Sequence, residues 1–479
     1  MKNKYLYYLK TKKAFILLFL VVLILKLPII NLPLHWDTSD SVVPNAIYIM
    51  NNDFNPFIPT MGPPDKPSTI TEVKYGEHDW GHPPLFELIL ALTYTLFSYS
   101  LFISHLIVII FAFLAVFYTY LTCKLLFNKR IALYSSLLLL FSPLFFAQSG
   151  TLNHSIPLTS LGIISIYYYL KNNYIKFIIS SSILVLLKEQ GLFIIMGLFL
   201  HHIITKKFNL RKTMCFLPPI MIFVSWLLLH KFYTGWLFYP NLFNFDIYHL
   251  TTSLFNNLKL IFFDNIGMSF LTISLIILSY LDMKQNQEFK IRGVPLLLTI
   301  VTPFILFFSI AHHQLPRYFL PIMPIIFLIY GNIINIIKNK KIQSLFFFLI
   351  ILFFVTSWFG NNNFIGGSAG HVLEKNLEYV DFVKVKSDAL NFIEHDYQNE
   401  TILTSWPMTF QAQFPHLGYV SSPLNIIEVD KEENNYSIIL YSPQSTSNEK
   451  MINIIKDENT ILIKRFEKKG KVVKVYSKH

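Results

Sequence analysis

The chain has 479 residues, of which 53% are hydrophobic and 14% are charged, and its mean hydropathy is +0.46. A soluble domain carries about 25% charged residues, so water cannot be the solvent for most of this chain. The net charge of +12 would suit a nucleic-acid partner, but the Lys and Arg residues fall in short clusters between apolar runs, and we expect no nucleic-acid partner. Only two cysteines occur, Cys123 and Cys215, both in apolar segments, which argues against a disulfide framework and a cysteine-based metal site.

The apolar runs predict a polytopic α-helical membrane protein with about eleven spans and additional interfacial helices, since a helix needs about 20 residues to cross the hydrocarbon core. The expected spans lie near residues 14–33, 102–126, 131–148, 155–170, 174–187, 190–205, 213–230, 263–281, 294–311, 318–337 and 342–359. The run from Leu85 to Phe97 remains, and a run of this length is typical of an interfacial or re-entrant helix.

The basic clusters predict which side of the membrane each segment faces. Five lysines between residues 2 and 13 precede the first span, which places the N-terminus in the cytoplasm and residues 34–83 outside. The later clusters alternate consistently with this arrangement, so the segment after the last span is also expected outside. We therefore predict a multi-span domain over residues 1–360, with an external loop at 34–83.

The character of the sequence changes after residue 360. Charged residues become frequent, and short β-rich runs alternate with a helical stretch, DFVKVKSDALNFIEHDY. The runs are TILTSWP, YSIILYSP, TILIKRF and KVVKVYS, and the last two are joined through EKKGK as in a hairpin. Residues 361–479 are therefore predicted to form a small external α/β soluble domain.

The first external loop concentrates acids and histidines in a chain that is otherwise poor in acids. Asp37 and Asp40 follow the first span closely, so they are expected near the membrane surface, where a carboxylate can act as a base. The later group, GEHDWGHPPL, ends at two prolines that begin the short apolar helix, which brings its side chains to the interface as well. The residues of this group are Glu77, His78, Asp79 and His82. The set His78, Asp79 and His82 is alternatively a candidate site for a divalent cation.

Later external turns add polar groups of the opposite sign. The turn QSGTLNHS contains His154, and Lys188 with Glu189 interrupts another apolar hairpin. The turn HHQLPR contains His312, His313 and Arg317, and Tyr318 follows it. Ionisable residues at membrane depth are costly and usually functional, although Lys and Arg at the end of a span often merely reach for water.

These residues together resemble the dolichyl-phosphate-mannose protein mannosyltransferase superfamily of GT-C glycosyltransferases, which includes the aminoarabinose transferases of lipid A. The resemblance covers about residues 14–340 and rests chiefly on GHPPL and PRYFLPIMP, with KLLFNKR and LLLLFSPLFFAQSGTLNHSIPL in the same order. The family places an Asp–Glu pair in the first external loop, followed by a small residue on a helix. In DSVVPNA these positions hold Asp40, Ser41 and Ala46, with Asp37 one helical turn earlier as a substitute acid. A further family acid, before an M-P-L or I-P-L string, is Ser155 here.

The resemblance implies an inverting transfer of a sugar from a polyprenyl-phosphate carrier to a hydroxyl of a glycan, lipid or protein, on the external face of the cell (inner) membrane. Asp40, or Asp37, would be the general base. Cations and hydrogen-bond donors would bind the donor phosphate, and the candidates are Arg317, Lys188, His312, His313 and Tyr318. A divalent cation is the one cofactor left open.

Two other readings stay open from the sequence. A polytopic transporter would place its site at the midplane on broken helices, whereas the acids and bases here gather at one face. Another envelope polysaccharide ligase or polymerase would share the same pattern. The sugar, the acceptor and the oligomeric state have no signal in the sequence.

Overall fold

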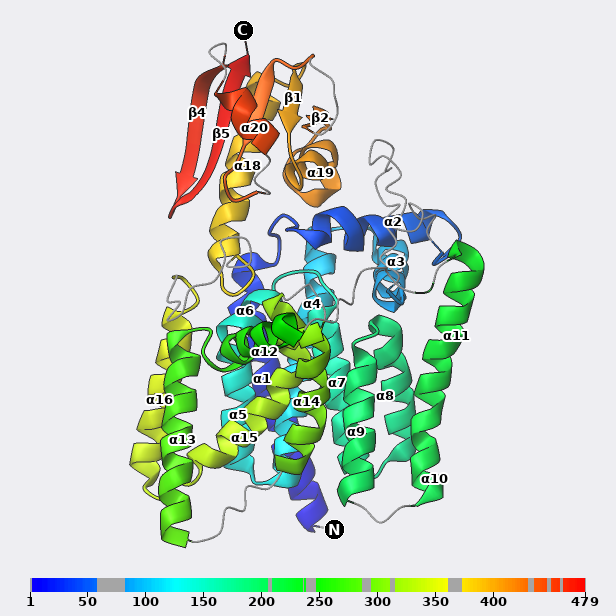
Figure 1. The fold of residues 1–479 in the computed structure, drawn as a ribbon, viewed down its shortest axis with the longest axis vertical. Coiled ribbons are helices and arrows are strands. Elements are labelled where there is room, and N and C mark those ends of the chain that lie inside the picture. The colour runs from blue at the N-terminus through cyan, green and yellow to red at the C-terminus, as the bar shows by residue number, and fades with distance from the viewer. Residues whose placement is uncertain are drawn as a thin grey trace.

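The computed structural model describes residues 2–57, 82–205, 209–235, 237, 247–286, 294–310, 315–360, 373–429, 435–445, 449–456 and 460–478. Figure 1 shows a bundle of long helices, with the N-terminus at one end and a small β-sheet that carries the C-terminus at the other. The chain is therefore mostly helical, with several apolar helices and a mixed sheet, as the composition predicts.

The bundle consists of one helix or helix pair for each of the eleven expected spans. Its helices are α1 (Lys2–Lys26), α4 (Leu101–Leu126), α5 (Lys129–Phe141), α6 (Pro143–Gln148), α7 (Ser155–Leu170), α8 (Tyr174–Leu187), α9 (Gly191–Thr205), α10 (Leu210–Thr213), α11 (Leu217–Thr234), α12 (Ile247–Phe262), α13 (Ile266–Asn286), α14 (Val294–Ile310), α15 (Met323–Ile334) and α16 (Lys340–Thr356). A 3₁₀ turn, η5 (Pro316–Ile322), leads into α15.

Length and composition limit how many of these helices qualify as spans by themselves. In the described residues, the segments Leu101–Leu126, Leu210–Thr234 and Pro316–Ile334 are long and apolar enough to cross a membrane. A fourth span results if α12 and α13, which meet at a 94° bend, count as one. Further apolar helices are shorter, between 10 and 17 residues. The chain is thus a multi-pass helical membrane protein, and the number eleven stays a prediction.

Asparagines begin the helices that follow the basic turns. The side chain of Asn128 accepts hydrogen bonds from the backbone N–H groups of Arg130 and Ile131, at 2.9 and 3.1 Å. Asn173, Asn209 and Asn339 cap α8, α10 and α16 in the same way. These side chains satisfy donors that the first turn of a helix leaves unpaired, so each Asn fixes where its helix starts.

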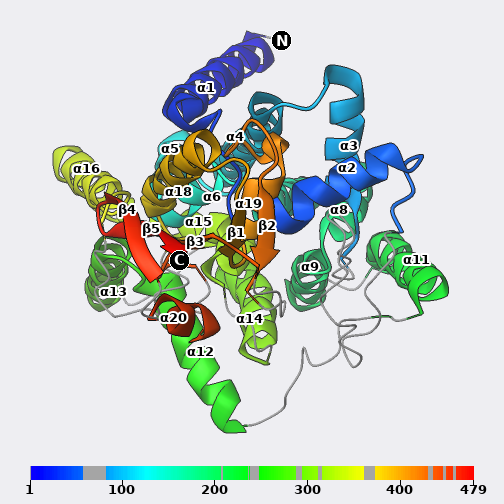
Figure 2. The ribbon, with the colours of Figure 1, turned by 90° about the horizontal axis from the view of Figure 1, so that it is seen from above.

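Two short helices lie across the end of the bundle that faces the sheet. The π-helical turn η2 (Thr38–Val42) leads into α2 (Val43–Asn51), which runs nearly perpendicular to the bundle helices and over α3 (Leu85–Phe97), as both ribbon views show (Figures 1 and 2). The helix expected from Leu85 to Phe97 is therefore present with those bounds. Ala46, the small residue of the family pattern, is fully buried on α2.

The C-terminal part forms a five-stranded sheet in the order β2-β1-β3-β5-β4. Its strands are β1 (Thr401–Thr404), β2 (Asn425–Glu428), β3 (Ile438–Tyr441), β4 (Thr460–Lys468) and β5 (Lys471–Lys478). Strand β1 pairs in parallel with β2 and β3, whereas β5 is antiparallel to both β3 and β4. The helices of this part are α18 (Glu378–Asp396), α19 (Met408–Gln413) and α20 (Glu449–Ile455).

The expected β4–β5 hairpin is present. Lys468 pairs with Lys471, and the two residues between them, Lys469 and Gly470, have φ values of 47° and 76°. Two-residue hairpin turns with positive φ at both central positions match the right-handed twist of the flanking strands. Strand β2 is the one strand of the sheet that the sequence did not predict.

The C-terminal part packs directly on the first loop. The backbone N–H of Leu34 donates to the carbonyl of Leu417 at 3.0 Å, and the Tyr99 hydroxyl donates to the carbonyl of His416. This docking brings residues after position 373 against the residues that follow the first span. The predicted boundary at 360/361 falls next to residues 361–372, which lie outside the described part, and the external position of both regions stays a prediction.

Candidate active site

The residues after the first helix form a tight turn that holds two carboxylates. Trp36 adopts a positive φ of 51°, and Asp37 then begins the π-helical turn η2. The Ser39 hydroxyl donates to the Trp36 carbonyl at 2.6 Å, and the Ser41 hydroxyl donates to the Asp37 carbonyl at 2.8 Å. These local bonds fix Asp37 and Asp40 about one turn apart. Position 41, where the family has its second acid, thus serves the backbone here.

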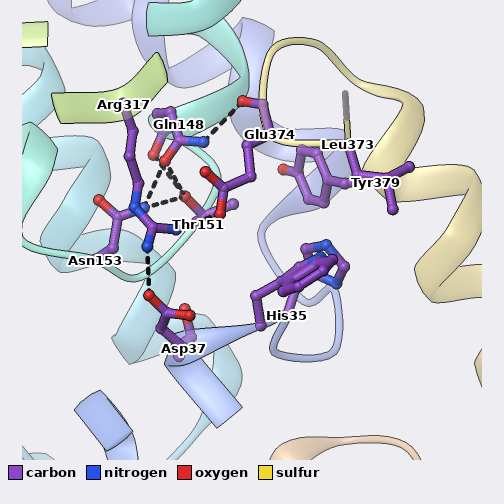
Figure 3. Close-up of a pocket in the computed structure, with 11 residues that line it drawn as sticks. His35, Asp37, Gln148, Thr151, Asn153, Arg317, Leu373, Glu374 and Tyr379 are labelled. Carbon is purple, nitrogen blue, oxygen red and sulfur yellow. Dashed lines mark hydrogen bonds and ion pairs between the residues drawn. The ribbon is translucent and has the colours of Figure 1, made fainter. Parts of the chain in front are cut away.

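Arg317 lies between two carboxylates from distant parts of the chain. Its guanidinium is ion-paired with Asp37 and with Glu374 (Figure 3). Arg317 and Glu374 are almost fully buried, with side chains 8% and 7% exposed, whereas Asp37 is 43% exposed. Gln148 fixes this arrangement, because its amide donates to the Glu374 carbonyl at 2.8 Å. The expected phosphate-binding arginine is therefore already neutralised by two acids.

Asp40 is held from the C-terminal part. The indole N–H of Trp406 donates to Asp40 Oδ2 at 2.7 Å, and the Trp406 ring packs edge-on against Trp36 with centroids 5.2 Å apart. Burial and the neighbouring carboxylate of Asp37 raise the pKa of Asp40 to about 7, against the opposing effect of the Trp406 N–H. A carboxylate with a pKa near 7 is well matched to general base catalysis at neutral pH.

A second cluster pairs two histidines with two acids. His82 Nδ1 lies 2.8 Å from Glu189 Oε2, and His154 Nε2 lies 2.8 Å from Glu87 Oε1. The two imidazole rings are 6.1 Å apart. Burial alone would raise the pKa of Glu189, but His82 and Lys188 outweigh it and lower this pKa to about 2. Glu189 is therefore ionised at any physiological pH.

Tyr318 connects the two clusters. Lys188 Nζ lies 5.1 Å from the centroid of the Tyr318 ring, and Arg317 Cζ lies 5.7 Å from it. A cation within about 6 Å of a tyrosine ring centroid makes a favourable cation–π contact. The structure thus brings together most of the described residues that the sequence selected, from Asp37 through Arg317, Tyr318 and Lys188 to the histidine pairs.

Several expected site residues lie outside the described part of the chain. These are Glu77, His78, Asp79, His312 and His313. His82 is the one described member of the candidate metal set, and it contacts Glu189. Within the described residues, no group of three His, Cys, Asp or Glu side chains is placed to hold a metal ion.

Three site residues were not selected from the sequence. Glu374 and Trp406 belong to the segment after the last helix of the bundle and reach the site only through the docking of that segment. Glu87 is the single acid in an apolar helix, and that isolation is the one local feature that would have drawn attention to it.

The sequence of part of the chain matches one protein family, and the fold of the chain is similar to that of a solved protein. The family model described as dolichyl-phosphate-mannose-protein mannosyltransferase matches residues 81–243, a segment that contains His82, His154 and Lys188. A comparison of the sequence with curated proteins gave no match.

Two solved structures are similar to nearly the whole chain. The crystal structure of ArnT from Cupriavidus metallidurans bound to undecaprenyl phosphate is 13% identical, with a TM-score of 0.59 and 98% of each chain covered. The same protein in the apo state is also 13% identical, with a TM-score of 0.60, 97% of this chain covered and 98% of that one. The resemblance inferred from the sequence is thus confirmed: residues 81–243 match the dolichyl-phosphate-mannose-protein mannosyltransferase family, and the chain has an ArnT-like fold.

Proposed function

We propose that this protein is a membrane glycosyltransferase that moves a sugar from a polyprenyl-phosphate carrier to an acceptor hydroxyl on the external face, with inversion. The observation that carries the proposal is the half-buried Asp40 carboxylate, hydrogen-bonded to Trp406 and located in the same loop as the Asp37–Arg317 ion pair. The family match over residues 81–243 and the undecaprenyl phosphate bound to the structurally similar ArnT support the choice of donor.

The reaction needs one base and a stabilised leaving group. Asp40 takes the proton of the acceptor hydroxyl while its oxygen bonds to the anomeric carbon. The bond between that carbon and the phosphate oxygen breaks on the opposite face, and the electron pair leaves with the polyprenyl phosphate. A phosphate is a good leaving group and needs no separate acid of the glycosidase kind. One displacement of this type inverts the anomeric centre.

Lys188 and Arg317 are the described cations that would receive the phosphate. Negative charge that develops in the transition state is stabilised most by charges already held in place. Arg317 is held by Glu374, which is buried, and by Asp37, which is substantially more exposed. We propose that the phosphate displaces Asp37 from Arg317, because this carboxylate loses the least burial when it turns to solvent.

The proposal is tested by comparing Asp40→Asn with Asp37→Asn in the purified, lipid-reconstituted protein. Transfer from radiolabelled polyprenyl-phosphate sugars is measured, with membrane yield recorded for both variants. Base catalysis is typically worth a factor of about 10² to 10⁴, so Asp40→Asn is expected to lose that much turnover while still inserting. Asp37→Asn should cost less, because Arg317 keeps Glu374.

A full-rate Asp40→Asn protein contradicts the assignment of the base. If Asp37→Asn is inactive and Asp40→Asn is active, the general base is Asp37 and not Asp40. If reconstituted vesicles take up free solutes and no sugar is transferred, the protein is a transporter and not a glycosyltransferase.

A further inference from the structure

A narrow pocket opens beside Asp37, where four segments meet. The first loop contributes His35 and Asp37, the last residue of α6 is Gln148, and η5 contributes Arg317. The segment before α18 contributes Glu374, and α18 itself contributes Tyr379 (Figure 3). The pocket is therefore built partly by the C-terminal part, and it adjoins the proposed base without including it.

Polar atoms in this pocket lack partners within the described part of the chain. Both ring nitrogens of His35, the hydroxyl of Tyr379 and Oε2 of Glu374 are buried and make no hydrogen bond there. The three residues are 6%, 1% and 7% exposed. A buried polar group without a partner is destabilising, and in native proteins each such group calls for an explanation. Three of them in one pocket point to a ligand that supplies the missing bonds.

The chemistry of these groups selects the ligand. Burial, with the positive charges of Lys386 and Arg317, lowers the pKa of His35, so its imidazole is neutral and offers one donor and one acceptor. Tyr379 offers a hydroxyl and Glu374 a carboxylate oxygen. The His35 and Tyr379 rings are stacked, with centroids 5.6 Å apart, so each ring holds the other in place beside the pocket. Arg317 is the one cation among the lining residues, and the proposed function assigns it to the donor phosphate. The part of the pocket formed by His35, Tyr379 and Glu374 therefore fits a neutral group with hydroxyls best.

We propose that this pocket receives the hydroxyl-bearing edge of a sugar ring, with Tyr379, His35 and Glu374 as its hydrogen-bond partners. The sugar is either the one carried by the donor or one that belongs to the acceptor. The inference rests on the proposed function and specifies where that reaction recognises a sugar. The pocket has room for about one water-sized group, so it admits a hydroxyl at the edge of a ring and leaves the ring itself outside.

Tyr379→Phe distinguishes a role in ligand binding from a role in folding, because the first changes a KM and the second changes thermal stability. This hydroxyl has no partner in the described residues, so its removal should leave thermal stability unchanged or slightly higher. Loss of a hydrogen bond to the sugar should instead raise a KM by about tenfold. The matched control is Tyr419→Phe, since Tyr419 is also 1% exposed with a buried hydroxyl that lacks a partner, but it does not line the pocket.

Two series of rate measurements, one with varied donor concentration and one with varied acceptor concentration, distinguish the source of the sugar. A rise in the KM for the polyprenyl-phosphate sugar at saturating acceptor assigns the pocket to the donor, and a rise in the KM for the acceptor assigns it to the acceptor. His35→Phe, which keeps an aromatic ring but removes both nitrogens, should raise the same KM.

Unchanged KM values in Tyr379→Phe, or lower thermal stability with both KM values unchanged, overturn the inference. If the parent protein transfers sugar and Asp40→Asn does not, the proposed function survives that result. A parent protein that transfers no sugar to any acceptor contradicts the function, and the inference with it.

Discussion

The protonation of Asp40 depends on neighbours from two parts of the chain. Burial and the Asp37 carboxylate favour the protonated form, whereas the Trp406 N–H favours the ionised form. The other charged groups near this loop are Arg317 and Glu374, which pair with Asp37 or with each other, and Lys386, which donates to Gln411 at 2.8 Å. Trp406 is thus the described donor that acts on the carboxylate directly from the C-terminal part.

Trp406→Phe should move the pH dependence of the reaction upward. A general base works only when ionised, so the rate should rise with pH through the pKa of Asp40, near 7. Removal of the donor raises that pKa, and the rising limb should shift by about one pH unit to higher pH. Asp37→Asn removes a neighbouring negative charge and should shift the limb to lower pH. The rate is measured from pH 5.5 to 9 in each variant.

Trp358→Phe is the control, because the Trp358 N–H also makes a buried hydrogen bond, to the Phe141 carbonyl at 2.9 Å, but outside the site. It should change protein yield without moving the pH profile. A Trp406→Phe profile that coincides with that of the parent would remove Trp406 from the positioning of Asp40.

Sequence reasoning selected the candidate site residues whose signal is local. Asp37, Asp40, Lys188 and Arg317 were selected because they stand at the ends of apolar runs. In the structure Arg317 contacts Asp37, and Arg317 and Lys188 both lie beside the Tyr318 ring. Trp406 was not predictable, since 366 positions separate it from Asp40 and nothing in TSWPMTF marks an indole that faces a carboxylate. The pairing of Asp37 with Arg317 likewise depends on tertiary structure alone.

At the scale of elements, apolar runs predicted the helices well, and proline explains where the expected spans are divided. The expected span 131–148 is two helices, because Pro143 has no N–H to continue α5 and begins α6 instead. The span expected from residue 318 starts as 3₁₀ turns that contain Pro316 and Pro321. Helix α12 was not predicted because HLTTSLFNNLKL is amphipathic. Its polar residues make its mean hydropathy lower than that of the apolar runs taken as spans.

The contact between α9 and α14 depends on a glycine. A Cβ on Gly197 would lie 2.6 Å from both the Cα of Ile300 and the carbonyl oxygen of Thr299, which are backbone atoms and cannot move aside singly. We expect Gly197→Ala to destabilise the bundle by about 1–3 kcal/mol through overpacking and to reduce folded yield. Gly162→Ala is the matched control, since its Cβ would meet only the flexible end of Ile194.

Thermal stability in detergent, measured by the loss of monodisperse protein on heating, compares the two variants. Equal stability of Gly197→Ala and the parent would show that α9 and α14 can separate without cost, contrary to the packing described.

At the scale of the whole molecule, the elements that follow Asp40, Glu374 and Trp406 in the chain, α2, α18 and α19, lie toward the end opposite to the N-terminus and α10 (Figure 1). The basic turns capped by asparagine supply the signal for the cytoplasmic side. The helical class and the family resemblance followed from composition and motifs, whereas the docking of the sheet on the first loop did not, because its contacts join residues that are hundreds of positions apart.

Cysteine labelling should establish the sidedness. In a Cys215→Ser background, with Cys123 buried, a cysteine at Asn51 should react with a membrane-impermeant maleimide in intact cells. A cysteine at Asn172, in the basic turn before α8, should react only after the cells are opened. Protection of the Asn51 position in intact cells, or labelling of the Asn172 position, would contradict the topology.

The contribution of Glu374 and Trp406 to the site also bears on the order in which the protein is made. Synthesis adds about 5–20 residues per second, so the 366 positions between Asp40 and Trp406 take about 20–70 s to translate. During that interval the Asp40 carboxylate lacks the indole, and Arg317, once made, lacks Glu374 until a further 57 positions are translated. Under the proposed function, a chain still attached to the ribosome would therefore be a poor catalyst of sugar transfer.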